Sequence, residues 1–86
     1  MKASKLQAAV EAILFASGEP IELERIAEAL EIEPEVCEQV IYNLSAKLDE
    51  RNSGITVLKL GDKYQLSSRT EYAEVIRDVL ELRKNT

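Results

Sequence analysis

The chain has 86 residues, which is enough for one domain with a thin core, because short chains bury a smaller share of their surface on folding. Apolar residues make up 45% of it and charged residues 31%, a composition that is ordinary for a globular domain and argues against disorder. The formal net charge of −5 disfavours nucleic acid and anionic membranes as partners, since phosphate binding requires clustered Lys and Arg. A local basic patch can still exist within an acidic total, so each surface has to be considered separately.

The first half of the chain has the apolar spacing of three helices. We expect them over residues 4–17, 22–30 and 34–51, with Ser4 as the N-cap of the first and Pro34 as the first residue of the third. Gly18-Glu19-Pro20 ends the first helix and Asn52-Ser53-Gly54 the third. The third helix has an apolar stripe for the core, with Cys37 at its edge: Val36, Val40, Ile41, Leu44 and Leu48.

The spacing of apolar residues then changes to that of strands. Residues 55–60 and 64–68 are predicted to form a hairpin around the turn Gly61-Asp62-Lys63. Thr70 is a predicted N-cap for a last helix over residues 71–83, whose apolar stripe is Tyr72, Ile76, Val79 and Leu80. Three helices, a hairpin and a further helix follow one another in the winged-helix order. The expected fold is therefore mainly α with a small β-hairpin, a single winged-helix domain over residues 1–86.

The residue types required by most enzymes are missing. The chain has no His, which removes the commonest general base and metal ligand, and its one Cys, Cys37, falls on a helical stripe and predicts a small core residue. One Cys without His does not supply a zinc site, and three scattered Gly do not form a phosphate-binding loop. We expect no enzyme, no cofactor and no metal. No apolar run approaches the length of a membrane span, and the start of the chain does not resemble a signal peptide, so we expect a cytoplasmic protein.

The third helix is the one that would enter the DNA major groove in a DNA-binding winged helix. Its predicted outer face contains four acids and no base. The residues of this face are Glu35, Glu38, Gln39, Tyr42, Asn43, Ser45, Ala46, Asp49 and Glu50. Lys47 and Arg51 lie only at the border of this face. Gln39 and Asn43 are residue types that read adenine, but no cations stand beside them to position a phosphate backbone. Lys59, Lys63 and Arg69 make the hairpin more basic, a pattern that fits a DNA-contacting wing but more often marks solvated surface.

Three large apolar residues lie outside the core stripes: Phe15, Tyr42 and Leu82. Phe15 lies opposite the stripe of the first helix and shares its side with Ala8 and Ala12. Single exposed apolar residues are common, and a contact within the chain is an alternative cover for Phe15. An exposed aromatic beside small residues also suits a helix–helix contact between subunits. We therefore take Phe15, Tyr42 and Leu82 as candidate residues of a partner interface.

The segment Glu11-Ala12-Ile13-Leu14-Phe15-Ala16-Ser17-Gly18-Glu19-Pro20-Ile21 resembles the N-terminal signature of the segregation and condensation protein B (ScpB) family. Gly54-Ile55-Thr56-Val57-Leu58, Tyr64-Gln65-Leu66 and Tyr72 are similar to the wing of that family and the start of its following helix. Gly61-Asp62-Lys63 departs from the family's glycine-rich pair before the Tyr, which affects the tip of the hairpin only. The resemblance covers essentially the whole chain.

The resemblance implies the first of two tandem winged-helix domains in a longer, non-catalytic scaffold subunit. Its expected partners are a second copy of itself, a kleisin subunit (ScpA) and an SMC ATPase, in a nucleoid-associated, condensin-like complex that condenses and segregates bacterial chromosomes. It implies that the N-terminal domains self-associate and that the second domain makes much of the kleisin contact. It implies no catalytic or cofactor residues. From the residues alone, a winged-helix DNA-binding transcriptional regulator and a small acidic adaptor for an unrelated complex remain alternatives.

Overall fold

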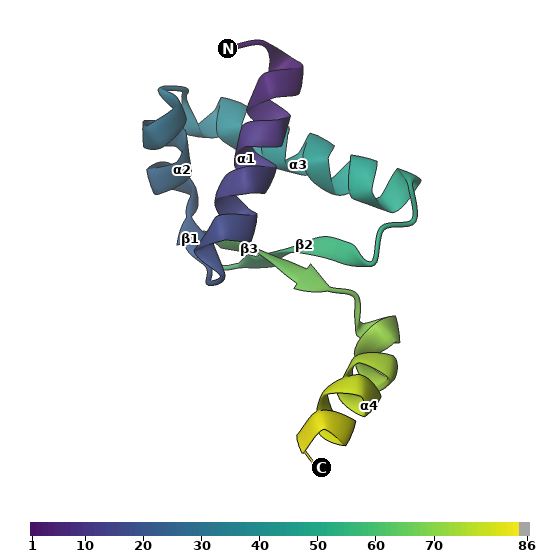
Figure 1. Cartoon of the computed structure of the whole chain (residues 1–86). Coiled ribbons are helices and arrows are strands. Elements are labelled where there is room, and N and C mark those ends of the chain that lie inside the picture. Colours follow the sequence, from purple (N-terminus) through teal and green to yellow (C-terminus); the bar gives the residue numbers. More distant parts are fainter. Residues whose placement is uncertain (85–86) are drawn as a thin grey trace.

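The protein is described by a computed structural model that covers residues 1–84, with side chains described for residues 1–81. Its elements in chain order are α1 (Ala3–Ser17), β1 (Ile21–Glu22), α2 (Leu23–Leu30), α3 (Pro34–Glu50), β2 (Ile55–Leu60), β3 (Lys63–Ser68), the 3-10 turn η1 (Thr70–Tyr72) and α4 (Ala73–Lys84). Figure 1 shows α1, α2 and α3 packed together over a small sheet, while α4 extends away from them. This arrangement confirms the mainly α winged-helix fold.

The helix ends follow from a few backbone positions. Gly18 has a φ of 69° and ends α1 in the left-handed conformation, which glycine adopts without a steric penalty. Pro34 opens α3 as predicted. The two predicted side-chain caps are wrong. Ser4 lies inside α1, because the carbonyl of Lys2 already accepts the amide of Leu6 at 2.9 Å, and η1 begins at Thr70 itself with no side-chain cap.

The sheet has three antiparallel strands in the order β1-β3-β2. Leu60 pairs with Lys63, so the hairpin loop is Gly61-Asp62 only, and Lys63 belongs to β3 rather than to the predicted turn. The φ of 68° at Gly61 is the positive value that a two-residue hairpin loop requires there. In addition, the amide of Leu23 donates to the carbonyl of Asp62 at 2.9 Å, which ties the tip of the hairpin to the start of α2.

The core lies between α1, α2, α3 and the sheet. Its buried side chains are Leu6, Val10, Leu14, Ile26, Ala27, Cys37, Val40, Ile41, Leu44, Leu48 and Tyr64. The predicted stripe of α3 is wrong at one position, because Val36 is 46% exposed whereas Cys37 is fully buried. Both neighbours are apolar, so the sequence spacing fits either one. Contacts with α1, α2 and β2 fix the rotation of α3 that buries Cys37.

Helix α4 is the largest departure from the sequence prediction. The sequence predicts a core stripe of Tyr72, Ile76, Val79 and Leu80, yet all four are exposed, and Val75 beside them is exposed as well. The other helices and the sheet enclose the core without any side chain from the described part of α4. The apolar side of α4 is therefore not packed against any other element of the described chain.

The core assignment predicts a contrast between two positions on α3. Leu44→Ala should lower the free energy of unfolding by about 2–5 kcal/mol, because the residue is 2% exposed and its removal leaves a cavity. Val36→Ala should cost much less, since that side chain is already half in water. Urea unfolding of both variants measures the difference, and an equal loss at the two positions would contradict the observed rotation of α3.

Candidate interaction surfaces

The outer face of α3 surrounds one aromatic side chain with acids. Tyr42 is 68% exposed, and Glu35, Glu38, Asp49 and Glu50 are exposed on the same helix. The position of Tyr42 follows from the rotation of α3, because burial of Cys37, Ile41 and Leu48 turns the opposite side of the helix to solvent. An apolar ring within a polar rim is the arrangement of an anchor residue in a protein interface.

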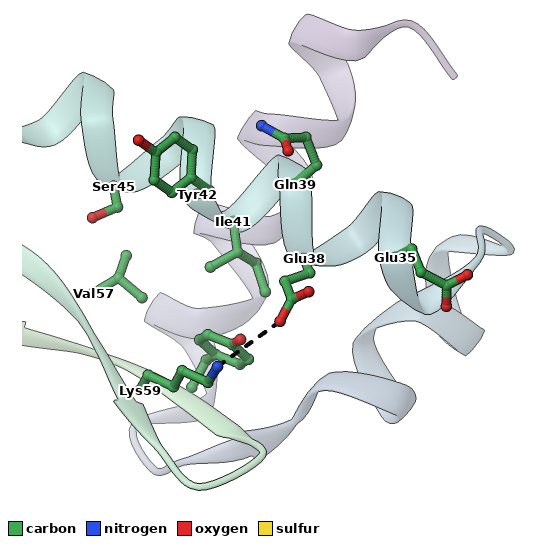
Figure 2. Close-up of a pocket in the computed structure, with 9 residues that line it drawn as sticks. Glu35, Glu38, Gln39, Ile41, Tyr42, Ser45, Val57 and Lys59 are labelled. Carbon is green, nitrogen blue, oxygen red and sulfur yellow. Dashed lines mark ion pairs between the residues drawn. The ribbon is translucent and has the colours of Figure 1, made fainter.

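A groove of about 440 Å³ separates this face of α3 from the hairpin. Its lining residues come from α3, β2 and β3: Glu35, Glu38, Gln39, Ile41, Tyr42, Ser45, Val57, Lys59 and Tyr64. Figure 2 shows Lys59 of β2 reaching toward Glu38 of α3, where the two charges are 3.9 Å apart. The Nζ atom of Lys59 also lies 6.0 Å from the centre of the Tyr64 ring. The groove thus has an apolar floor and a mainly acidic rim.

Several of the groups that would contact DNA are engaged within the chain. The amide nitrogen of Gln39 donates to the side-chain oxygen of Asn43 at 3.1 Å, so these two adenine-reading residue types bond to each other. Of the hairpin cations, Lys59 faces Glu38, and Arg69 pairs with Asp49 at 2.7 Å. Acids of α3 therefore neutralise part of the basic charge that a DNA-contacting wing requires.

A second groove, of about 350 Å³, lies beside Phe15. Residues of α1, the end of α3, β2 and β3 line it: Ala8, Glu11, Ala12, Phe15, Leu48, Arg51, Ser53, Ile55 and Leu66. Phe15 is 80% exposed, so no contact within the described chain covers it. At the rim, Arg51 and Glu11 form an ion pair of 3.6 Å between two solvent-exposed side chains. The predicted cluster of Phe15 with Ala8 and Ala12 is confirmed as one surface.

The three candidate residues from the sequence do not form a single patch. Phe15 lines the groove on α1 and Tyr42 lines the groove between α3 and the hairpin. Leu82 belongs to α4, but its side chain lies outside the described residues. The exposed residues Val75, Ile76, Val79 and Leu80 of α4 form a further apolar surface, which apolar spacing in the sequence does not distinguish from a core stripe.

The structure also bears on the residues considered for chemistry. Cys37 is a free thiol at the centre of the core, and burial raises its pKa from the ordinary value of 9.0, so the thiol stays protonated and unreactive.

In the part of the chain that the structure describes, no group of three or more His, Cys, Asp or Glu side chains is placed to hold a metal ion. Within the same residues, no helix is both long enough and apolar enough to span a membrane.

The raised pKa of Cys37 predicts a pH dependence of stability. The unfolded thiol ionises at a lower pH than the folded one. The contribution of Cys37 to the free energy of unfolding is therefore fully present below pH 9.0 and is lost as the pH rises through the higher folded pKa. Chemical unfolding of wild type and Cys37→Ala at several alkaline pH values isolates this contribution, because other titrating groups are common to both. The stability of wild type relative to Cys37→Ala should fall with rising pH, and a constant or rising difference would contradict the account.

Three packed helices, a hairpin wing and an acidic outer face on the third helix define a winged-helix domain whose surface favours protein partners over nucleic acid. The family model described as segregation and condensation complex subunit ScpB matches residues 8–86. The chain belongs to this family.

Individual relatives are similar over nearly the whole chain. A segregation and condensation protein B from Lachnoclostridium phytofermentans is 34% identical over 76 residues, which are 88% of this chain and 40% of the relative. A crystal structure of the dimer of an ScpB N-terminal domain complexed with an ScpA peptide is 30% identical with a TM-score of 0.83, over 88% of this chain and 95% of that one. ScpB from Mycobacterium tuberculosis shares the fold at 21% identity, with a TM-score of 0.92 over 100% of this chain and 54% of its own. The chain spans less than half the length of the first two curated relatives.

Proposed function

We propose that this chain is the N-terminal winged-helix domain of a non-catalytic scaffold subunit in a condensin-like SMC–kleisin complex. In this proposal the domain forms a homodimer and helps to hold a kleisin subunit and an SMC ATPase together during chromosome condensation and segregation. The observation that supports it best is the similarity to the ScpB N-terminal domain dimer bound to an ScpA peptide. The match to only part of each curated relative supports a second domain beyond the present chain.

The surfaces of the domain fit such a role. Two grooves with apolar side chains in their lining and the exposed stripe of α4 are available for macromolecular contacts. A thin core also gains stability when partners cover apolar surface. A dimer presents two copies of each groove, so one assembly holds two kleisin-binding units. The domain would then bias the geometry of the ATPase ring through binding alone. Action on the chromosome places the protein in the cytoplasm, associated with the nucleoid.

The self-association in this proposal is measured by sedimentation of the chain at tens of micromolar, where a dimer is expected. Phe15→Glu should weaken the dimer without unfolding the domain, because it places a charge on a side chain that is 80% exposed. Circular dichroism confirms the fold of the variant. A wild-type chain that sediments as a monomer contradicts the proposed homodimer, and a Phe15→Glu dimer of unchanged strength removes Phe15 from its interface.

Binding to a kleisin and binding to duplex DNA, measured on the same chain, distinguish a protein-binding domain from a DNA-binding one. The chain should be retained by an immobilised kleisin of the same bacterium, and it should give no anisotropy change with labelled duplex DNA at physiological salt. The acidic outer face of α3 opposes the release of counterions that drives DNA binding. Tight DNA binding with a steep salt dependence would instead identify a winged-helix regulator, and retention by neither partner would leave the adaptor of an unrelated complex.

A further inference from the structure

The exposed apolar stripe of α4 is a surface without a partner in this chain. Val75, Ile76, Val79 and Leu80 lie on one side of the helix and are between 37% and 63% exposed. The opposite side carries charge, including Arg77, Asp78 and Glu81. A helix of 12 residues is marginally stable in water on its own, so most of its stability has to come from burial of its apolar side.

The start of α4 is held in a defined direction. The amide of Arg69 donates to the carbonyl of Gly54 at 2.9 Å, and its guanidinium donates to the carbonyl of Ser53 and to the carboxylate of Asp49, the latter at 2.7 Å. The Arg69 side chain is only 22% exposed, so water screens this contact less than an ordinary surface pair. The amide of Tyr72 then donates to the carbonyl of Arg69 at 3.0 Å and begins η1. These bonds hold the segment that leads into α4, and Figure 1 shows α4 extending away from α1.

The groove beside Phe15 has the features of a surface that receives an apolar helix. Ala8 and Ala12 leave room for a close approach on α1, while Phe15, Ile55 and Leu66 supply apolar area around them. The apolar stretch from Ala8 to Phe15 is about 10 Å long and that from Val75 to Leu80 about 8 Å, at 1.5 Å per helical residue. The stripe of α4 and this groove therefore match in chemistry and in length, although one chain does not bring them together.

We propose that α4 of each copy packs into the Phe15 groove of a second copy, which gives a two-fold dimer with two identical α4–groove contacts. This inference rests on the self-association proposed above and specifies its surface. A second copy is the occupant best supported, because the related ScpB N-terminal domain is a dimer and its chain is matched over 95% of its length, so it contains little beyond the counterpart of this domain. The pinned junction at Arg69 lowers the entropy lost on docking, since α4 already extends outward before the partner arrives.

The first test changes the stripe of α4 alone. Val79→Lys places a charge in the proposed contact, whereas Glu81→Lys places the same residue on the opposite side of the same helix. Neither position belongs to the core, so both variants should match the wild-type chain in circular dichroism and unfolding midpoint when all three are compared at a concentration where they are monomeric. In sedimentation equilibrium we expect the dimer dissociation constant to rise about tenfold or more for Val79→Lys and to stay unchanged for Glu81→Lys.

The second test asks whether α4 meets the groove or another α4. Ala12→Glu should weaken the dimer as Val79→Lys does. An equimolar mixture of the two variants should form mixed dimers. In a mixed dimer, one of the two α4–groove contacts has the wild-type residues on both sides, and the other pairs the new Lys with the new Glu. If α4 packed on α4, Ala12→Glu alone would stay dimeric, and it would offer no complementary charge to the Lys of the Val79→Lys variant.

The outcomes separate the two proposals. A monomeric wild-type chain overturns the proposed homodimer and this inference with it. A dimeric wild type whose Val79→Lys variant is equally dimeric overturns the α4 contact and leaves the homodimer in place. Loss of the dimer in both single variants, with recovery on mixing, is the result that this inference predicts.

Discussion

Five side chains of α3 fill the space between α1, α2 and the sheet: Cys37, Val40, Ile41, Leu44 and Leu48. Because they occupy one side of a regular helix, their burial fixes what the opposite side presents to solvent. That side carries Tyr42 within a group of acids and forms one wall of the groove against the hairpin. The same packing completes the core without α4. Both the acidic outer face and the uncovered fourth helix thus depend on the way α3 is buried.

Charge pairing then decides which class of partner the wing can bind. A winged helix that binds DNA needs cations on the third helix and the hairpin to face phosphates. Here Glu38 and Asp49 of α3 lie within ion-pair distance of Lys59 and Arg69. Arg69 has a second role, because its bonds to the carbonyls of Ser53 and Gly54, in the segment after α3, hold the start of the last helix. Lys59 and Arg69 therefore serve internal contacts, which a count of charges does not reveal.

Local patterns in the sequence predicted the order of elements, the first residue of α3 and the exposure of Phe15 and Tyr42. They were insufficient where the result depends on distant parts of the chain. The two-residue strand β1 has no periodicity of its own and exists because Ile21 pairs with Tyr64. Val36 and Cys37 fit the same stripe, and only packing distinguishes them. The stripe of α4 predicts an apolar contact, but a sequence pattern does not tell whether such a contact lies within one chain or between two.

Amide hydrogen exchange tests most directly whether a second copy of the chain covers the apolar side of α4. An uncovered helix of this length opens readily, whereas a docked one exchanges only when the dimer dissociates. Exchange of the α4 amides should be followed from about 1 µM to about 100 µM, with the α3 amides as an internal reference. The account predicts that protection of α4 rises with concentration while that of α3 changes much less. Protection of α4 that is absent, or equal at all concentrations, would contradict it.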